Sequence, residues 1–225
     1  MNANLGRLLV IAPHPDDEVL GCGGTIARMA GQNAEVHVAV VTRGLPPAFT
    51  EEMTQQVRCE AKKAHEHLGV RKTHWIDLPA AQLAQTPHSK LNAELQILLR
   101  AVRPDTLLIP FVGDVHLDHQ LVFLSSLVAA RPVQPEYPRT ILAYETVSET
   151  NWNAPYVTPG FVPNVFIDIE STLPRKLEAA AMFASQIKEF PHERSVEALR
   201  ALATVRGAAM HLKSAEAFVL LRNVM

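Results

Sequence analysis

Short apolar runs alternate with helix-like segments through the first 130 residues. The first run, Leu8–Ala12, is wholly apolar and too short for a helix, which indicates a buried strand. The predicted strands span residues 8–12, 35–41, 73–78 and 106–109. Between and after them, apolar residues recur every three or four positions, which predicts helices. These helices span residues 16–30, 53–68, 91–102 and 118–130, and Gly69 supplies a stop after the second.

Strands that alternate with helices indicate a parallel sheet with right-handed crossovers. We therefore expect a Rossmann-like, doubly wound α/β fold, with helices on both faces of a mostly parallel sheet. The C-terminal part is expected to add strands at 141–144, 165–169 and 217–221 and helices at 174–190 and 195–206. The length of 225 residues suits a single domain, residues 1–225.

Charge and composition exclude several classes of protein. Lys and Arg total 21 and Asp and Glu total 23, so the formal net charge is 21 − 23 = −2. The chain has no basic stripe, and we expect no nucleic-acid partner. No apolar run approaches the ~18 residues of a membrane span, so no membrane partner is expected. Two cysteines, Cys22 and Cys59, are too few for a disulfide framework and fit a reduced, cytoplasmic protein.

Proline is unevenly distributed. Six of the 16 prolines fall between residues 131 and 164. This distribution predicts a long, shaped loop region there, because proline fixes its own φ angle and lacks a backbone donor.

A histidine and three acids follow the first predicted strand, in the run His14-Pro15-Asp16-Asp17-Glu18. In open α/β sheets, ligands bind beyond the C-terminal ends of the strands. A purely structural interpretation is also available: Pro15 suits the first turn of a helix, the acids complement its dipole, and His14 caps it. The segment after the fourth strand favours a functional interpretation.

Two histidines, His116 and His119, follow the fourth strand with the same spacing of three that separates His14 from Asp17. Residues three apart at a helix start face one direction, and the sheet rule places the two groups close together. Two imidazoles and one carboxylate can hold Zn²⁺ with a position left open, which is typical of a catalytic site. The same donor set also suits Fe²⁺.

Two further carboxylates stand beside these histidines. Asp16 is placed to act as a general base towards water that the metal activates. Asp118 is placed to orient a neighbouring imidazole, as carboxylates around metal sites often do.

The stretch from Ala12 to Gly24, together with His116-Leu-Asp-His119, resembles the LmbE-like (PIG-L-type) family of zinc-dependent N-deacetylases. The resemblance extends over nearly the whole chain and includes the runs 175–178, 185–186 and 215–218. It implies a hydrolase that removes an acetyl group from a small N-acetylated amino sugar of the N-acetylglucosamine type. Members of this family often form oligomers, so the resemblance is compatible with a homo-oligomer.

The resemblance implies roles for the first motif and for its partner histidine. The metal ligands would be His14, Asp17 and His119. Asp16 would be the general base. Zinc would polarise the amide carbonyl and lower the pKa of its water towards about 7.

The resemblance also implies roles around the second motif. His116 would stay off the metal and act as general acid or oxyanion stabiliser, and Asp118 would tune His116. Some relatives carry a tyrosine two positions before this histidine. The present chain has Asp114 there, which we expect to bind a sugar hydroxyl.

Four other residues are expected to bind the substrate, each with a structural alternative. Arg43 follows the second strand, where substrate loops lie, or is a solvated loop arginine. Arg58 resembles a family arginine that lines the pocket, or makes an ordinary surface ion pair. His192 and Arg194 close over the substrate, or belong to a plain turn between helices.

Two patterns receive structural interpretations only. His65-Glu66-His67 lacks the spacing that two ligands on a helix need, which indicates a solvated helix face. The glycines of Gly21-Cys-Gly23-Gly24 lie inside a predicted helix, unlike those of a dinucleotide-binding loop, which indicates close helix packing.

Two other functions are compatible with parts of this pattern. One is a metal-dependent amidase or esterase that acts on a non-sugar acyl substrate. The other is a non-catalytic module that binds a nucleotide or a sugar. A base beside a metal argues against the second, because a binding module needs none.

Overall fold

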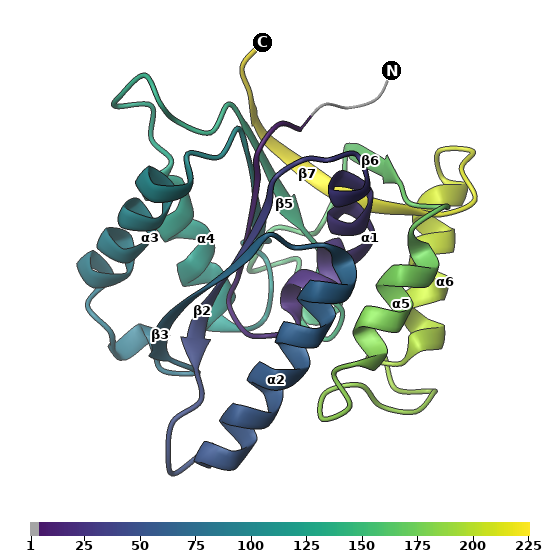
Figure 1. The fold of residues 1–225 in the computed structure, drawn as a ribbon, viewed down its shortest axis with the longest axis horizontal. Coiled ribbons are helices and arrows are strands. Elements are labelled where there is room, and N and C mark those ends of the chain that lie inside the picture. The colour runs from purple at the N-terminus through teal and green to yellow at the C-terminus, as the bar shows by residue number, and fades with distance from the viewer. Residues whose placement is uncertain (1–4) are drawn as a thin grey trace.

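The structure, a computed structural model, describes residues 5–225. Within these residues seven strands form one sheet (Figure 1). They are β1 (Leu8–Ala12), β2 (Val36–Arg43), β3 (Lys72–Pro79), β4 (Thr106–Pro110), β5 (Thr140–Tyr144), β6 (Val165–Asp168) and β7 (Ala215–Asn223). Their order is β3-β2-β1-β4-β5-β7-β6. The first five are parallel, and β7 is antiparallel to both of its neighbours.

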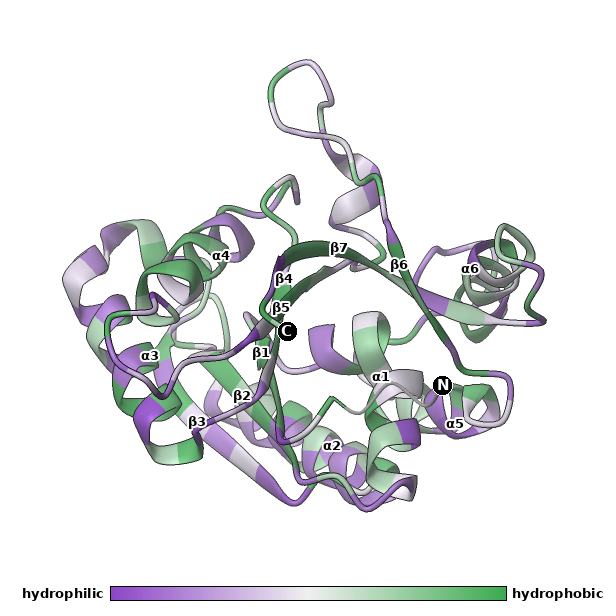
Figure 2. Ribbon diagram, turned by 90° about the horizontal axis from the view of Figure 1, so that it is seen from above, coloured by the Kyte–Doolittle hydropathy of each residue, from purple (hydrophilic) through white to green (hydrophobic). Residues whose placement is uncertain are grey.

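Helices cover both faces of this sheet. They are α1 (Asp17–Gly31), α2 (Glu51–Leu68), α3 (His88–Val102), α4 (Leu117–Ala129), α5 (Leu173–Ala181) and α6 (Val196–Ala208), with short 3-10 helices η1 (Leu83–Gln85) and η2 (Thr150–Trp152). One face carries α1, α2, α5 and α6, and the other carries α3 and α4 (Figures 1 and 2). The predicted doubly wound α/β fold is confirmed.

The first strand shows how the sequence builds the two layers. Side chains alternate between the faces of a strand. Leu8 and Val10 therefore enter the core beneath α1, α2 and α5, while Leu9 and Ile11 enter the core beneath α3 and α4. A strand that is apolar at every position needs a cover on both faces, which this fold provides.

The helix predicted over residues 174–190 is wrong in its second half. The helix α5 ends at Ala181, and Phe183 then turns into the core with 1% of its surface exposed. The backbone N–H and the hydroxyl of Ser185 donate to the Glu60 carboxylate at 3.2 and 2.5 Å. These contacts with α2 hold the segment in turns, which helical periodicity does not encode.

The proline-rich region 131–164 contains β5, which matches the strand predicted at 141–144, and the short helix η2, which was not predicted. The segment before β6 projects from the rest of the molecule (Figure 2). Its Tyr156 side chain is fully exposed.

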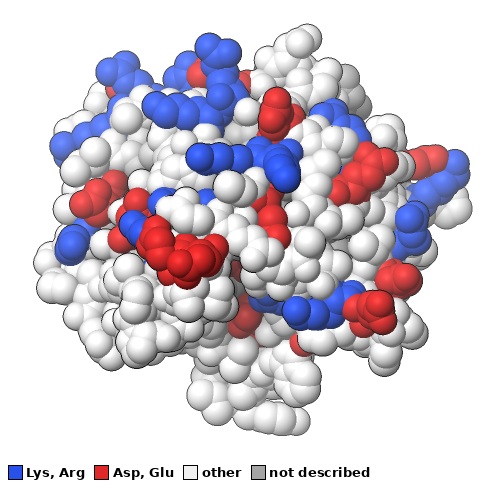
Figure 3. Space-filling model, turned by 60° about the horizontal axis from the view of Figure 1, so that its bottom comes forward, with Lys and Arg blue, Asp and Glu red and all other residues white. Residues whose placement is uncertain are grey.

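The distribution of charged side chains on the surface agrees with the small net charge of the chain. On the face shown in Figure 3, basic and acidic side chains are interspersed, so this face has no extended patch of one sign. No helix within residues 5–225 is long and apolar enough to cross a bilayer.

One buried ion pair joins α1, α5 and β7. Lys176 Nζ lies 2.6 Å from Glu216 Oε1, and both side chains are buried. The Glu216 carboxylate also accepts the backbone N–H groups of Gly24 and Thr25 at 2.8 and 2.7 Å. The charge of Lys176 is thus paired with that of Glu216, and both Glu216 oxygens accept hydrogen bonds.

Two glycines bring α1 against its neighbours. A Cβ atom on Gly24 would lie 2.8 Å from the side chain of Ile169, and one on Gly21 would lie 2.4 Å from the ring of Tyr144. Neither position has room for a methyl group. The interpretation of this segment as close helix packing is confirmed.

We expect Gly21→Ala to lower the free energy of unfolding by about 1–3 kcal/mol, because its methyl group would overpack the contact with Tyr144. Urea unfolding measures the change. Gly31→Ala in the same helix is the matched control, since nothing lies within 4 Å of its Cβ position. The control should keep or gain stability. Equal losses in both variants would contradict the packing argument.

Candidate active site

The segments after β1 and β4 meet at the carboxyl end of the sheet. These strands are adjacent and parallel, with Leu8 opposite Thr106 and Val10 opposite Leu108. Both therefore leave the sheet at the same edge, the lower one in Figure 1. The first leads into α1 and the second into α4, so the starts of these two helices bring their side chains together.

Three of these side chains, His14, Asp17 and His119, offer ligand atoms within 4.8 Å of one another. Asp17 Oδ2 lies 3.4 Å from His14 Nδ1 and 3.2 Å from His119 Nε2. Within the described residues, Asp17 Oδ1 and His119 Nε2 are buried without a hydrogen-bond partner. Buried polar atoms are normally paired. A carboxylate oxygen and an imidazole nitrogen left in this way fit a bound metal ion.

Asp114 supports the deepest of these residues. Its Oδ2 lies 2.8 Å from His119 Nδ1, and its Oδ1 accepts the Thr150 hydroxyl at 2.6 Å. The expectation that Asp114 binds a sugar hydroxyl is wrong, because this side chain has no exposed surface and both oxygens have partners. Asp114 instead orients an imidazole, as carboxylates behind metal ligands do.

Asp118 contacts a different histidine from the one expected. Its Oδ2 lies 3.1 Å from His14 Nε2, and the carboxylate also accepts the backbone N–H groups of Ala81 and Leu83. The recorded hydrogen bond between Asp118 and His116 is made by the backbone N–H of Asp118, which donates to Nδ1 at 3.1 Å. The charge of the Asp118 carboxylate acts on His116 as well and raises its pKa, against the lowering effect of burial. His14, His116 and Asp118 form a second group that could hold a metal, so His14 belongs to both groups.

Burial and charge give Asp16 an unusual pKa. Burial raises the pKa of this carboxyl group, and the neighbouring Asp17 raises it further, to about 8, against the lowering effect of Arg194. A carboxylate whose pKa lies near neutrality is well matched to accepting a proton.

At His119 and at His14, neighbouring carboxylates raise the pKa more than burial lowers it. Burial lowers the pKa of His119, but the charge of Asp17 and the hydrogen bond to Asp114 outweigh it and raise the pKa to about 10. Burial also lowers the pKa of His14, but hydrogen bonds to Asp118 and Asp17 raise it to about 9. The carboxylates thus favour positive charge at this place, which a bound cation would supply in exchange for protons.

Comparison with known proteins agrees with this geometry. Residues 9–130 match the sequence profile of PIG-L, described as GlcNAc-PI de-N-acetylase, and this match spans both motifs. The chain belongs to the PIG-L family. The resemblance predicted from the sequence is confirmed, and so is the prediction of a deacetylase, a type of hydrolase.

Individual relatives place the PIG-L chain among proteins of similar length. Diacetylchitobiose deacetylase of Thermococcus kodakarensis is 28% identical over 211 residues, which cover 89% of this chain and 78% of that protein. A conserved protein of Thermus thermophilus has a TM-score of 0.79 at 24% identity, covering 97% and 96% of the two chains. A 4-carboxy-2-hydroxymuconate hydratase of Pseudomonas putida has a TM-score of 0.78 at 22% identity, covering 98% of each chain. These structures confirm the fold but do not determine the reaction.

Two of the arginines expected to bind substrate have protein partners. Arg58 pairs with Asp77, as the ion-pair alternative describes, and lies over the ring of Trp75, 4.4 Å from its centroid; its role towards the substrate stays a prediction. Arg43 pairs with Glu51 at 2.5 Å. Among the described residues, neither has a recorded contact with the metal-ligand group.

The run before α6 reaches the PIG-L site through one residue. His192 is exposed, and its Nδ1 accepts the backbone N–H of Arg194 at 3.0 Å. Arg194 itself extends to Asp16, with Nη1 2.9 Å from Oδ2. The structure therefore joins Arg194 to Asp16 of the first motif, while His192 stays at the surface.

Sequence reasoning missed His65. The prediction of a solvated face is wrong for this residue, which is 2% exposed. Its Nε2 lies 2.8 Å from Glu18 Oε1, and Glu18 Oε2 accepts the backbone N–H of Asp16 at 3.2 Å. The available signal was the apolar stripe of Ala61 and Leu68, because His65 occupies the same helix face.

Proposed function

We propose that this PIG-L protein is a zinc-dependent hydrolase that removes the acetyl group from an N-acetylated amino sugar of the N-acetylglucosamine type. The observation that carries the proposal is the group of His14, Asp17 and His119, in which a buried atom of Asp17 and one of His119 have no hydrogen-bond partner within the described residues, directly beside Asp16. The relative named diacetylchitobiose deacetylase supports the choice of an amino sugar.

His14, Asp17 and His119 would hold the metal. Bound zinc supplies a Lewis acid that polarises the amide carbonyl and lowers the pKa of water towards about 7. Asp16 is not in this ligand group, and its Oδ1 has no recorded hydrogen bond within the described residues. Asp16 therefore accepts the proton of the attacking water, and the carbonyl becomes tetrahedral.

His116 is placed to donate a hydrogen bond to the developing oxyanion, and the proton that Asp16 took from water then passes to the leaving amine. Burial lowers the pKa of this half-buried ring, and the charges of His14 and His119 lower it further, which favours the neutral form. The backbone N–H of Asp118 donates to Nδ1, so the neutral ring carries its proton on Nε2. A donor near the carbonyl oxygen stabilises the charge that forms there.

The free cysteines bear on the compartment in which the protein acts. Cys59 is exposed and free, and Cys22 is free and buried. Exposed free thiols suit a reducing compartment, so we propose that the protein acts in the cytoplasm.

Acetate release is the test of this function. Zinc-loaded and chelated protein are compared on free N-acetylglucosamine, its disaccharide, a nucleotide sugar and the inositol and malate glycosides. We expect release from at least one member, lost on chelation and restored by added zinc. No release from any member by protein that holds zinc would contradict the amino-sugar assignment. Turnover of a non-sugar amide or ester by the same protein would then favour the alternative hydrolase.

A further inference from the structure

The guanidinium group of Arg194 is held on three sides. Its Nη1 donates to Asp16 Oδ2 at 2.9 Å, and its Nε donates to Ser148 Oγ at 2.7 Å. Its Nη2 lies 3.7 Å from Glu149 Oε1. A guanidinium is planar and its N–H groups point in fixed directions, so three such contacts determine its orientation.

The backbone that carries Arg194 is also fixed. The next residue, Ser195, caps α6 by accepting the N–H of Ala198 at 3.1 Å. The N–H of Arg194 itself donates to His192 Nδ1. Arg194 therefore stands at the rigid start of a helix, which limits its freedom to swing away from Asp16.

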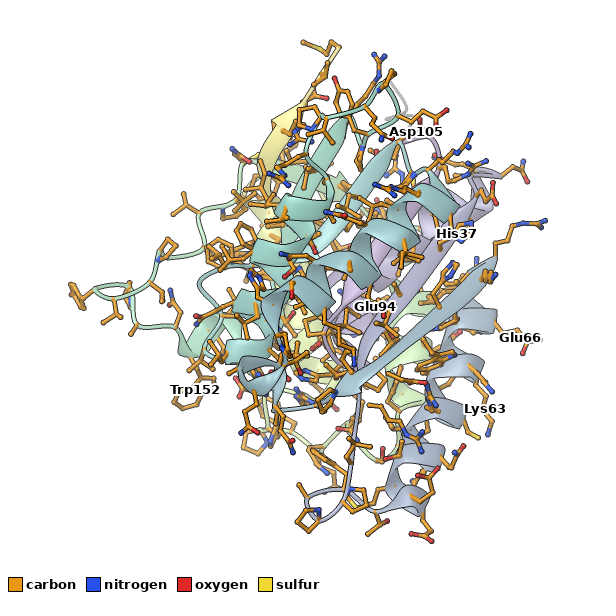
Figure 4. All side chains as sticks on the ribbon, turned by 90° about the vertical axis from the view of Figure 1, so that its left-hand side faces the viewer. His37, Lys63, Glu66, Glu94, Asp105 and Trp152 are labelled. Atoms are coloured by element: carbon orange, nitrogen blue, oxygen red, sulfur yellow. The ribbon has the colours of Figure 1, made fainter. Side chains whose placement is uncertain are left out.

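A second set of contacts ties this run to the loop that contains η2. The preceding residue, Glu193, accepts the indole N–H of Trp152 at 2.7 Å and a side-chain N–H of Asn151. Trp152 is labelled in Figure 4, where it lies near the carboxyl end of the sheet and far from Asp105 at the opposite end. The same loop provides Ser148, so its position and that of Arg194 are coupled.

These contacts leave one Asp16 oxygen unoccupied by protein. Arg194 takes Oδ2, and Glu18 accepts the backbone N–H of Asp16. The negative charge of Asp17 lies next to Asp16 in the chain and repels its carboxylate. Within the described residues, Arg194 alone donates a hydrogen bond to the Asp16 carboxylate.

We propose that Arg194 is a positioning residue: it holds the Asp16 carboxylate so that the second oxygen, Oδ1, faces the water it must deprotonate. This inference rests on the proposed function and differs from the expectation that Arg194 binds the substrate. A positioning residue acts on the rate of the chemical step, whereas a residue that binds substrate in ground and transition state alike acts on KM.

The experiment compares Arg194→Ala with the wild-type protein on the substrate found in the acetate assay. We expect kcat to fall about 100-fold with KM and zinc content unchanged, because small displacements of a catalytic group cost rate of this order. Guanidinium ions, added below the concentration that unfolds the protein, should restore part of the rate. Arg194→Lys should lose less of the rate than Arg194→Ala, because its ammonium group still reaches one of the three partners.

Two further variants keep the test decisive. Ser148→Ala removes one support of the guanidinium and leaves Arg194 in place, so a smaller fall in kcat is expected even where Arg194→Ala is unstable. Arg200→Ala is the matched control, because Arg200 is exposed on α6 and has no part in the site. The control should keep the wild-type kcat and show no response to guanidinium.

Several results would overturn the inference. They are an unchanged kcat in Arg194→Ala, a rise in KM at constant kcat, a loss of zinc from this variant, and a failure of guanidinium to restore any rate. A wild-type protein without acetate release overturns the proposed function and this inference together. An active wild type with an equally active Arg194→Ala overturns this inference alone.

Discussion

Asp16→Asn is expected to lower kcat by a factor of about 10²–10⁴ while the protein keeps its metal. The amide has nearly the shape of the carboxylate but accepts protons very poorly. The proposed metal ligands, His14, Asp17 and His119, do not include Asp16, so zinc content should equal that of the wild type. Steady-state acetate release and metal analysis of the same preparation measure the two quantities.

The control for this variant is Asp105→Asn, which makes the same chemical change at the opposite end of the sheet (Figure 4). It should keep wild-type turnover. Wild-type turnover in Asp16→Asn would remove Asp16 from the mechanism and transfer the role of base to another group. Loss of zinc in Asp16→Asn would instead make Asp16 part of the metal site.

Lys176→Met is expected to lower the free energy of unfolding by about 3–5 kcal/mol, because it leaves the charge of Glu216 buried and without its counterion. The N–H groups of Gly24 and Thr25 still donate to Glu216, but they carry no net charge. Urea unfolding measures the loss.

A surface pair provides the control for this variant. Lys213 pairs with Glu170, but its side chain is 81% exposed, so Lys213→Met should leave the free energy of unfolding unchanged within error. Adding Glu216→Gln to Lys176→Met should recover part of the lost stability, since no buried charge then remains. Equal stability of Lys176→Met and the wild type would show that the buried pair contributes nothing.

The sequence predicts the parallel part of the fold because there each element has its own local pattern. The run Leu8–Ala12 is a strand with the predicted bounds, and Gly69 ends α2 in the left-handed conformation. The meeting of the two motifs was also predictable, because each motif directly follows one of two adjacent strands.

The remaining features depend on contacts between residues far apart in the chain. The sequence places Arg194 over the substrate, but it does not indicate that the side chain contacts Asp16, 178 positions away. Likewise, an aspartate at position 114 can bind a sugar hydroxyl or orient His119, and only the burial of its side chain decides between them. Residue type thus predicts which chemistry is available, whereas the partner depends on tertiary packing.

The placement of β7 between β5 and β6 affects the order in which the chain can fold. Among the strands of residues 5–225, the edge strand β6 pairs with β7 alone, so it cannot join the sheet until this later strand is in place. The proposed metal ligands all precede residue 120, whereas Arg194 and Glu216, which contact Asp16 and α1, come from the later part. We therefore expect the proposed ligands to come together with the parallel strands, and the contacts to Asp16 and α1 to form only when the later part of the chain has packed against them.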